Sequence, residues 1–288
     1  MVTRAPTRVR VSVARHPLWS LELGLVALAY WVYSVVRDTH GATTVGVEQI
    51  AYQHGRDVQQ LERLLGVNVE LPLQHLMLRA PWLLRLLDAF YGSAHFVVTF
   101  GVLGYLLICR REDYARWRTC LLATTIIAVM LFALFPTAPP RLVPDDGVQD
   151  TLSTVGGLWS YNDGVLEHIT DPFAAMPSLH LAWSCWAAAA LAGTVGASWS
   201  AWRRWLFGLY PAAVTVTVIA TGAHWVLDTI AGGALLAAVW ACDHLVRRVR
   251  RRPGLHIVAP FPLMGLAEYS AVARVGQSTF PPQDAYAD

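Results

Sequence analysis

The sequence predicts an all-α membrane protein, a polytopic bundle of about six transmembrane helices. Of the 288 residues, 55% are hydrophobic and 15% are charged, against roughly 25% charged residues in soluble domains. The apolar residues form runs close to the roughly 20 residues that cross a bilayer. All 22 basic residues are arginine, and most of them cluster at the ends of these runs. Such clusters are typical of membrane topology signals and do not indicate nucleic-acid binding.

Each predicted span is justified by its length and by its flanking charges. The spans cover residues 18–36, 88–109, 117–136, 176–197, 204–221 and 224–246. The first is interpreted as an uncleaved signal anchor, because its apolar run is too long for a signal peptide and no cleavage site follows it.

The arginine clusters predict the orientation of the chain. They lie at the N-terminus, at 110–118, at 198–204 and at 247–252, and six alternating crossings put all four on one side. That side is cytoplasmic by the positive-inside rule. We therefore expect a multi-pass plasma-membrane protein with both termini cytoplasmic and with segments 37–87 and 137–175 extracytoplasmic.

These features divide the chain into five parts. They are a basic cytoplasmic N-terminus (1–17), the signal anchor (18–36), an extracytoplasmic amphipathic segment (37–87), a membrane core (88–246) and a basic, disordered cytoplasmic tail (247–288). Within the outer segment, 45–66 and 71–87 have apolar residues at helical spacing. They are expected to lie along the outer interface, either against lipid or as a lid packed on the bundle. The four cysteines show no paired spacing and predict neither a disulfide framework nor a zinc site.

Two polar motifs begin apolar segments on the predicted outer face. In Ala-Ala-Met-Pro-Ser-Leu-His at 174–180, Pro177 is expected at the first position of a helix, with His180 in its first turn. A helix N-terminus favours a bound phosphate, and Ser178 could add a hydroxyl donor. An ordinary helix start with an interfacial histidine is the alternative for this motif alone.

The second motif is Thr-Gly-Ala-His-Trp-Val-Leu-Asp at 221–228. His224 and Asp228 are four residues apart, so on a helix they share a face and the carboxylate can accept the imidazole N–H. A histidine oriented in this way can act as a nucleophile or a base. A structural pair is the simpler explanation of this motif alone, but two such motifs at one membrane depth favour a site for phosphate-ester chemistry.

Three further residues are candidates for this site. Arg141 is the only arginine in the 137–175 loop and could bind phosphate oxygens through two N–H groups. Tyr91 and His95 share one face of the second span, where they either line the site or bridge helices. Two histidines and an aspartate could also hold zinc or iron, but no fourth ligand supports a metal site.

With these motifs the chain resembles the type 2 phosphatidic acid phosphatase (PAP2) superfamily. The resemblance runs from about Tyr91 to Gly233 and also includes Ala-Pro-Pro-Arg-Leu at 138–142. Within the superfamily, the sequence is most similar to the branch of inositol phosphorylceramide synthase, the Aur1 type, and its bacterial relatives. The membrane core would then be a PAP2-like catalytic core.

The resemblance implies a lipid phosphatase or phosphotransferase that uses no metal or other cofactor. His224 would attack phosphorus to form a phosphohistidine, Asp228 would orient His224, and His180 would protonate the leaving group. Arg141 and Ser178 would bind the phosphate oxygens. The expected partners are a membrane lipid phosphate in the bilayer and, for a transferase, an alcohol acceptor such as inositol. No nucleic acid is expected.

The sequence also departs from the wider family pattern. It has no lysine, and Thr217 and Val218 stand where a Ser-Arg pair is usual. The phosphate-binding set is therefore incomplete, with Arg79 or Arg85 as candidate replacements. Head-group transfer, lipid phosphate transport without bond cleavage, and non-catalytic lipid binding remain alternatives to hydrolysis.

Overall fold

The structure is a computed structural model that describes residue 34 and residues 45–143, 147–151, 171–195 and 198–250. The predicted N-terminal segment and nearly all of the signal anchor lie outside the described residues, as does the tail beyond residue 250. The chain divides into two compact units, Met1–Cys242 and Asp243–Asp288. In the second unit, the described residues are the last turns of a helix, where Arg247 pairs with Asp243 at 2.8 Å.

The described elements are all helical, which confirms the predicted all-α class for this part of the chain. In chain order they are α2 (Val45–Leu65), α3 (Glu70–Leu78), α4 (Pro81–Cys109), α5 (Arg111–Leu134), η1 (Pro140–Leu142), α6 (Leu179–Thr194), α7 (Ala201–Arg204), η4 (Trp205–Gly208), α8 (Leu209–Ala220) and α9 (Val226–Arg250). The extended pairing among them is limited to an isolated bridge between Thr137 and Ala174.

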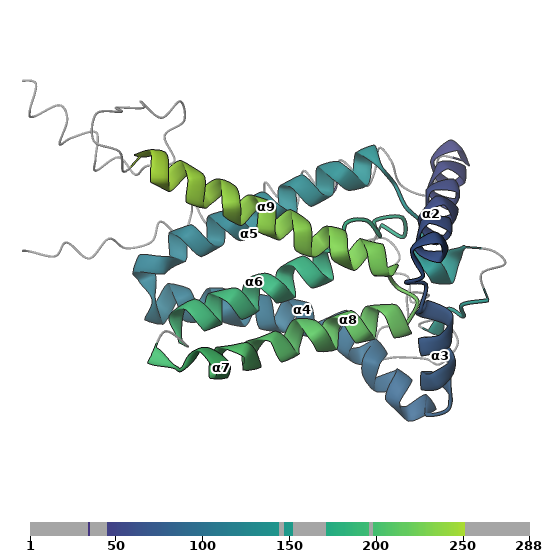
Figure 1. Ribbon diagram of the computed structural model, residues 1–288, viewed down its shortest axis with the longest axis horizontal. Coiled ribbons are helices and arrows are strands. Elements are labelled where there is room, and N and C mark those ends of the chain that lie inside the picture. The colour runs from purple at the N-terminus through teal and green to yellow at the C-terminus, as the bar shows by residue number, and fades with distance from the viewer. Residues whose placement is uncertain (1–33, 35–44, 144–146, 152–170, 196–197, 251–288) are drawn as a thin grey trace, which may run out of the picture. The chain divides into compact units, whose positions relative to one another are not determined.

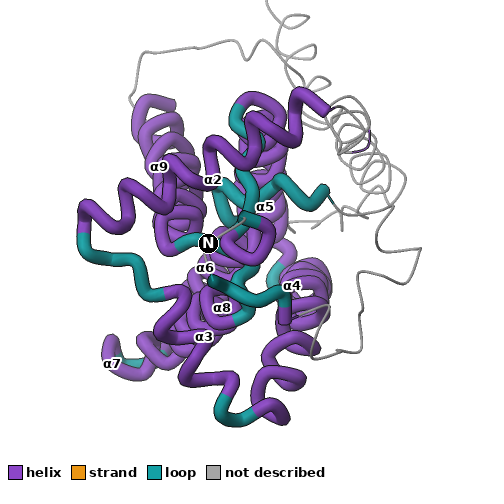
Figure 2. Tube along the Cα trace, turned by 90° about the vertical axis from the view of Figure 1, so that its right-hand side faces the viewer, coloured by secondary structure: helices purple, strands orange, loops and turns teal. Residues whose placement is uncertain are grey.

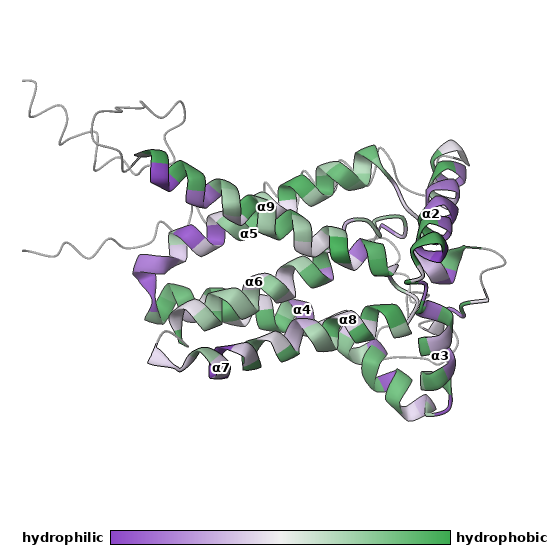
Figure 3. Ribbon diagram, viewed as in Figure 1, coloured by the Kyte–Doolittle hydropathy of each residue, from purple (hydrophilic) through white to green (hydrophobic). Residues whose placement is uncertain are grey.

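Three of the described helices are long and apolar enough to cross a membrane. They are Pro81–Cys109, Arg111–Leu134 and Val226–Val249, and green marks their hydrophobic residues in Figure 3. α6 has 16 residues, and α7, η4 and α8 continue one another without a break. The protein is therefore membrane-embedded, and the count of six spans stays a prediction.

The outer segment differs from its prediction at one boundary. Residues 71–87 were expected to form one amphipathic helix, but α3 ends at Leu78 and α4 already begins at Pro81. Proline has no N–H for a preceding helix, whereas its fixed φ suits a first helical position. The second predicted span consequently starts seven residues before residue 88.

Within Met1–Cys242, the long helices run side by side, and α2 and α3 lie across one end of them (Figure 1). The view from that end shows α2 and α3 in front of the bundle (Figure 2). A buried cluster joins α4, α5, α6 and α9, and at its centre the Trp186 indole donates to the Trp117 carbonyl oxygen at 2.9 Å. The bundle thus presents a fixed platform to the segments at its end.

A second cluster anchors α2 to that end. Ala51 and Val58 of α2 pack with Ala138, Phe173 and Trp225, all buried. The Trp225 indole donates to the Ala138 carbonyl oxygen at 2.9 Å. The three loop segments that carry the sequence motifs therefore meet beneath α2.

Two arginine clusters of the first unit lie away from this end. The junction of α4 and α5, with Arg110 and Arg111, is at the opposite end, as is α7 with Arg203 and Arg204 (Figure 1). These positions agree with the clustering of arginine on one side that the sequence predicts.

Candidate active site

His180 is placed by the start of α6. Ser178 is the N-cap of this helix, and its Oγ accepts a hydrogen bond from the Leu181 N–H at 3.4 Å. The Ser178 N–H in turn donates to the Asp228 carbonyl oxygen at 2.9 Å. His180 is the second residue of α6, as predicted for the first turn, whereas Pro177 precedes the N-cap and lies outside the helix.

His224 is placed by the turn that ends α8. Gly222 has a φ of 67°, the left-handed conformation that glycine adopts without steric cost. The Ala223 N–H donates to the Val218 carbonyl oxygen at 2.9 Å, and the Gly222 N–H donates to that of Ile219 at 3.0 Å. This pair of bonds is a Schellman motif, and it directs the chain back so that His224 faces α6.

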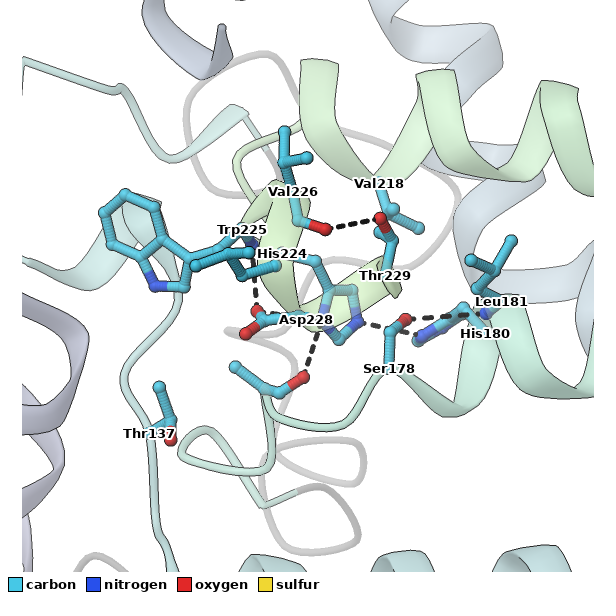
Figure 4. A network of polar contacts seen from close by, with 12 residues as sticks. Thr137, Ser178, His180, Leu181, Val218, His224, Trp225, Val226, Asp228 and Thr229 are labelled. Atoms are coloured by element: carbon cyan, nitrogen blue, oxygen red, sulfur yellow. Dashed lines mark hydrogen bonds and ion pairs between the residues drawn. The ribbon is translucent and has the colours of Figure 1, made fainter. Parts of the chain in front are cut away.

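The two histidines are in direct contact (Figure 4). His180 Nδ1 lies 3.1 Å from His224 Nε2, and His224 Nδ1 lies 2.9 Å from the Ala175 carbonyl oxygen. A carbonyl oxygen can only accept, so Nδ1 of His224 carries a hydrogen, and the neutral form of this ring has its lone pair on Nε2, which faces His180. The buried imidazole of His224, 4% exposed, is thus held in one orientation and one tautomer.

Asp228 lies beside His224, but its contacts differ from those predicted. α9 begins at Val226, so His224 precedes the helix and the two side chains do not share a helical face. Asp228 Oδ2 accepts the Trp225 N–H at 2.8 Å and lies 3.5 Å from His224 Nδ1. The carboxylate therefore caps α9 in the manner of the acidic half of a capping box, and the Ala175 carbonyl is the nearer hydrogen-bond acceptor of His224.

Tyr91 and His95 both contact His180. The Tyr91 ring stacks on the His180 ring at a centroid distance of 4.5 Å, and the His95 ring meets it edge-on at 4.3 Å. His95 Nδ1 also lies 3.0 Å from the Tyr91 carbonyl oxygen. The two α4 side chains predicted near the site thus fix the plane of the His180 imidazole.

A small pocket borders this group between α4, α6 and α8. Besides the polar residues Tyr91, His95, His180 and Thr217, its lining is apolar: Phe90, Ala94, Val214 and Val218. Thr217 and Val218, which stand where the family pattern has a Ser-Arg pair, therefore face this pocket.

Arg141 belongs to the same end of the bundle. Its backbone N–H donates to the Gly222 carbonyl oxygen at 3.0 Å, two residues before His224. Its side chain is 10% exposed, and its Nε lies 3.7 Å from Asp150 Oδ1. Arg79 and Arg85, the candidate replacements for the missing family cations, are exposed on the outer segment.

Sequence reasoning missed several buried acids near these residues. Asp88 is 2% exposed, with Oδ1 accepting the Thr151 hydroxyl at 3.2 Å. Glu62 and Glu70 accept backbone N–H groups at the start of α9. Asp88 carried a signal, a carboxylate at the start of a predicted span, whereas the two glutamates looked like ordinary charges on amphipathic helices.

The comparisons with known proteins place this geometry in a family. A model of the PAP2 superfamily matches residues 56–242, and neither a curated protein nor a solved structure matches the chain. The matched range takes in all the site residues from Tyr91 to Asp228. Because the match also spans well over half of the sequence, the chain belongs to the PAP2 superfamily, which generally comprises phosphatases and phosphotransferases acting on phosphate esters.

Proposed function

We propose that this protein cleaves or transfers a lipid-linked phosphate ester through a phosphohistidine formed on His224, at the extracytoplasmic face of the membrane. One observation carries the proposal. His224 is anchored through Nδ1 to the Ala175 carbonyl oxygen at 2.9 Å, and its Nε2 faces a second histidine at 3.1 Å. This placement supports the roles of nucleophile for His224 and proton carrier for His180, in a superfamily that generally comprises phosphate-ester enzymes.

The proposed reaction uses the two rings in sequence. A phosphoryl group enters between them, and the Nε2 lone pair of His224 attacks phosphorus while the bond to the leaving oxygen breaks. His180, protonated on both nitrogens at this stage, gives a proton to that oxygen and becomes neutral. Water or an alcohol then gives a proton to His180 and attacks phosphorus, and cleavage of the P–N bond restores His224.

The surrounding groups support this scheme. Arg141, nine-tenths buried and held near Asp150, is the cation proposed to bind the phosphate oxygens. The N-terminus of α6 adds the partial positive charge of its helix dipole. Ser178 contributes mainly by capping that helix, since its Oγ already accepts the Leu181 N–H.

A lipid substrate is favoured by the surroundings of His180. Half of the residues that line the pocket at His180 and His95 are apolar, namely Phe90, Ala94, Val214 and Val218 of α4 and α8. A phosphate ester bound there would have its organic group among hydrocarbon side chains. The arginine-bearing junctions lie at the far end of the bundle, which supports an extracytoplasmic site under the positive-inside rule.

The experiment that tests the proposal compares purified protein with its His224→Ala variant. Both are incubated with a phosphatidate, a polyprenyl diphosphate and a phosphoinositide, with and without inositol. Phosphate release that is lost in the variant supports a hydrolase, and a new phospholipid formed only with inositol supports a head-group transferase. Wild-type turnover retained by the variant, or transport of the intact lipid without cleavage, contradicts the proposal.

A further inference from the structure

Two glutamates from the outer helices are fully buried against the turn that carries His224. Glu62 lies near the end of α2 and is 0% exposed, and Glu70 is the first residue of α3 and is 1% exposed. Carboxyl groups are seldom buried to this degree without specific partners. Neither residue belongs to the motifs that define the site.

Their partners are consecutive backbone amides at the start of α9. Glu70 Oε1 accepts the Val226 N–H at 3.0 Å, and Glu62 Oε1 accepts the Leu227 N–H at 2.7 Å. Asp228 Oδ2 accepts the preceding Trp225 N–H at 2.8 Å. The first N–H groups of a helix have no partner within that helix, and here three carboxyl groups bind three of them directly after His224.

The second oxygen of Glu62 is the one that can carry a proton. Glu62 Oε2 is buried and has no hydrogen-bond partner among the described residues. Both oxygens of Glu70 already accept, Oε1 from the Val226 N–H at 3.0 Å and Oε2 from the Asn68 side-chain N–H at 3.1 Å. Burial, together with the neighbouring Glu70 of α3 and Asp228 of α9, raises the pKa of Glu62 to about 9.

We propose that Glu62 and Glu70 are positioning residues that hold His224 in its attacking orientation, by accepting the first backbone N–H groups of α9 and so clamping the start of that helix. The proposal rests on the proposed function only in that turnover reports the position of His224. The two hydrogen bonds connect α2 and α3, which lie across the end of the bundle (Figure 2), to Val226 and Leu227. These residues follow His224 closely in the chain, so the clamp fixes the backbone that carries the reacting nitrogen.

Glutamine substitutions at the two positions give opposite expectations. Glu62→Gln imitates the protonated acid, because its oxygen still accepts the Leu227 N–H and its amide is neutral. We expect kcat within about twofold of wild type for this variant, and a loss of at least tenfold for Glu62→Ala with KM nearly unchanged. Glu70→Gln replaces one of two accepting oxygens with an N–H donor, so kcat should fall at least tenfold. Gln60→Ala, on the exposed face of α2, is the matched control.

The pH dependence of stability distinguishes this role from simple packing, because a loss of packing alone would not change that dependence. The pKa of Glu62 is about 9 in the folded protein, against its ordinary value of 4.5. Between these two pH values the folded protein therefore keeps the Glu62 proton, whereas the unfolded chain releases it. Its contribution to stability is therefore lost as pH rises through that window. The thermal unfolding midpoint of the wild type should fall with pH up to about 9, and Glu62→Gln should remove part of that slope.

Equal losses of kcat in Glu62→Gln and Glu62→Ala would overturn the proposal, as would lowered stability with kcat intact in all three glutamate variants. A wild-type protein that is inactive toward every lipid phosphate tested counts against the proposed function instead. In that case the clamp is judged by unfolding alone, where an unchanged pH slope in Glu62→Gln overturns it.

Discussion

Replacing Gly232 with alanine should reduce activity about 100-fold. A Cβ at Gly232 of α9 would lie 2.2 Å from the Ser178 carbonyl oxygen and 3.0 Å from the Ser178 carbonyl carbon. Ordinary contacts of a Cβ begin near 3.4 Å, so α9 and the start of α6 would have to separate by about 1 Å. Overpacking of this kind costs about 1–3 kcal/mol of stability. Misplacement of reacting groups by about 1 Å can cost about 100-fold in rate, or about 2.7 kcal/mol.

The adjacent residue provides the control. Gly233 lies on the same helix, but a Cβ there would meet only Leu181 Cδ2 at 3.8 Å. Alanine at either position improves helix propensity by about 0.5–1 kcal/mol, so propensity alone predicts that both variants gain stability. The structure predicts that only Gly233→Ala gains stability.

The assay is steady-state turnover of the active lipid phosphate together with thermal unfolding in detergent. We expect Gly233→Ala to keep kcat within about twofold and Gly232→Ala to lose it. If Gly232→Ala is as active and as stable as Gly233→Ala, the close approach of α9 to Ser178 is wrong, and so is the account of how His180 is placed.

Two further predictions concern the turn around His224. Gly222→Ala should lower stability by more than the roughly 1–2 kcal/mol that a left-handed residue with a Cβ costs, because this Cβ would also meet Val148 Cγ1 at 2.6 Å. A wild-type unfolding midpoint would contradict this prediction. Asp228→Asn should fold normally, because an amide oxygen can still accept the Trp225 N–H, but kcat should fall about tenfold as the charge 3.5 Å from His224 Nδ1 is lost. An unchanged kcat would limit Asp228 to its capping role.

Much of the helical architecture follows from local sequence. The apolar runs predict the long helices α4, α5 and α9, because a bilayer sets both their length and their composition. The start of α4 was predicted at residue 88 but lies at Pro81. A long apolar run does not show where an amphipathic segment ends and a continuous helix begins. Ser178 and Gly222, by contrast, mark helix ends through capping chemistry that is visible in the sequence.

The site was predicted less completely because its contacts are long-range. The contact between His180 and His224 and the stacking of Tyr91 agree with the predicted grouping. The hydrogen bond from His224 to the Ala175 carbonyl oxygen could not be foreseen, because a backbone acceptor has no sequence signature. For the same reason Glu62 looked like a solvent-exposed charge: its partner amide is 165 residues away.

The most direct test of the central claim is to trap the covalent intermediate. Wild-type protein, His224→Ala and His180→Ala are mixed with a lipid phosphate labelled at phosphorus, quenched in alkali and digested, and the labelled peptide is identified by mass spectrometry. The account predicts label on the peptide that contains His224 in the wild type and none in His224→Ala. Label on another residue, or wild-type turnover by His224→Ala, would contradict it.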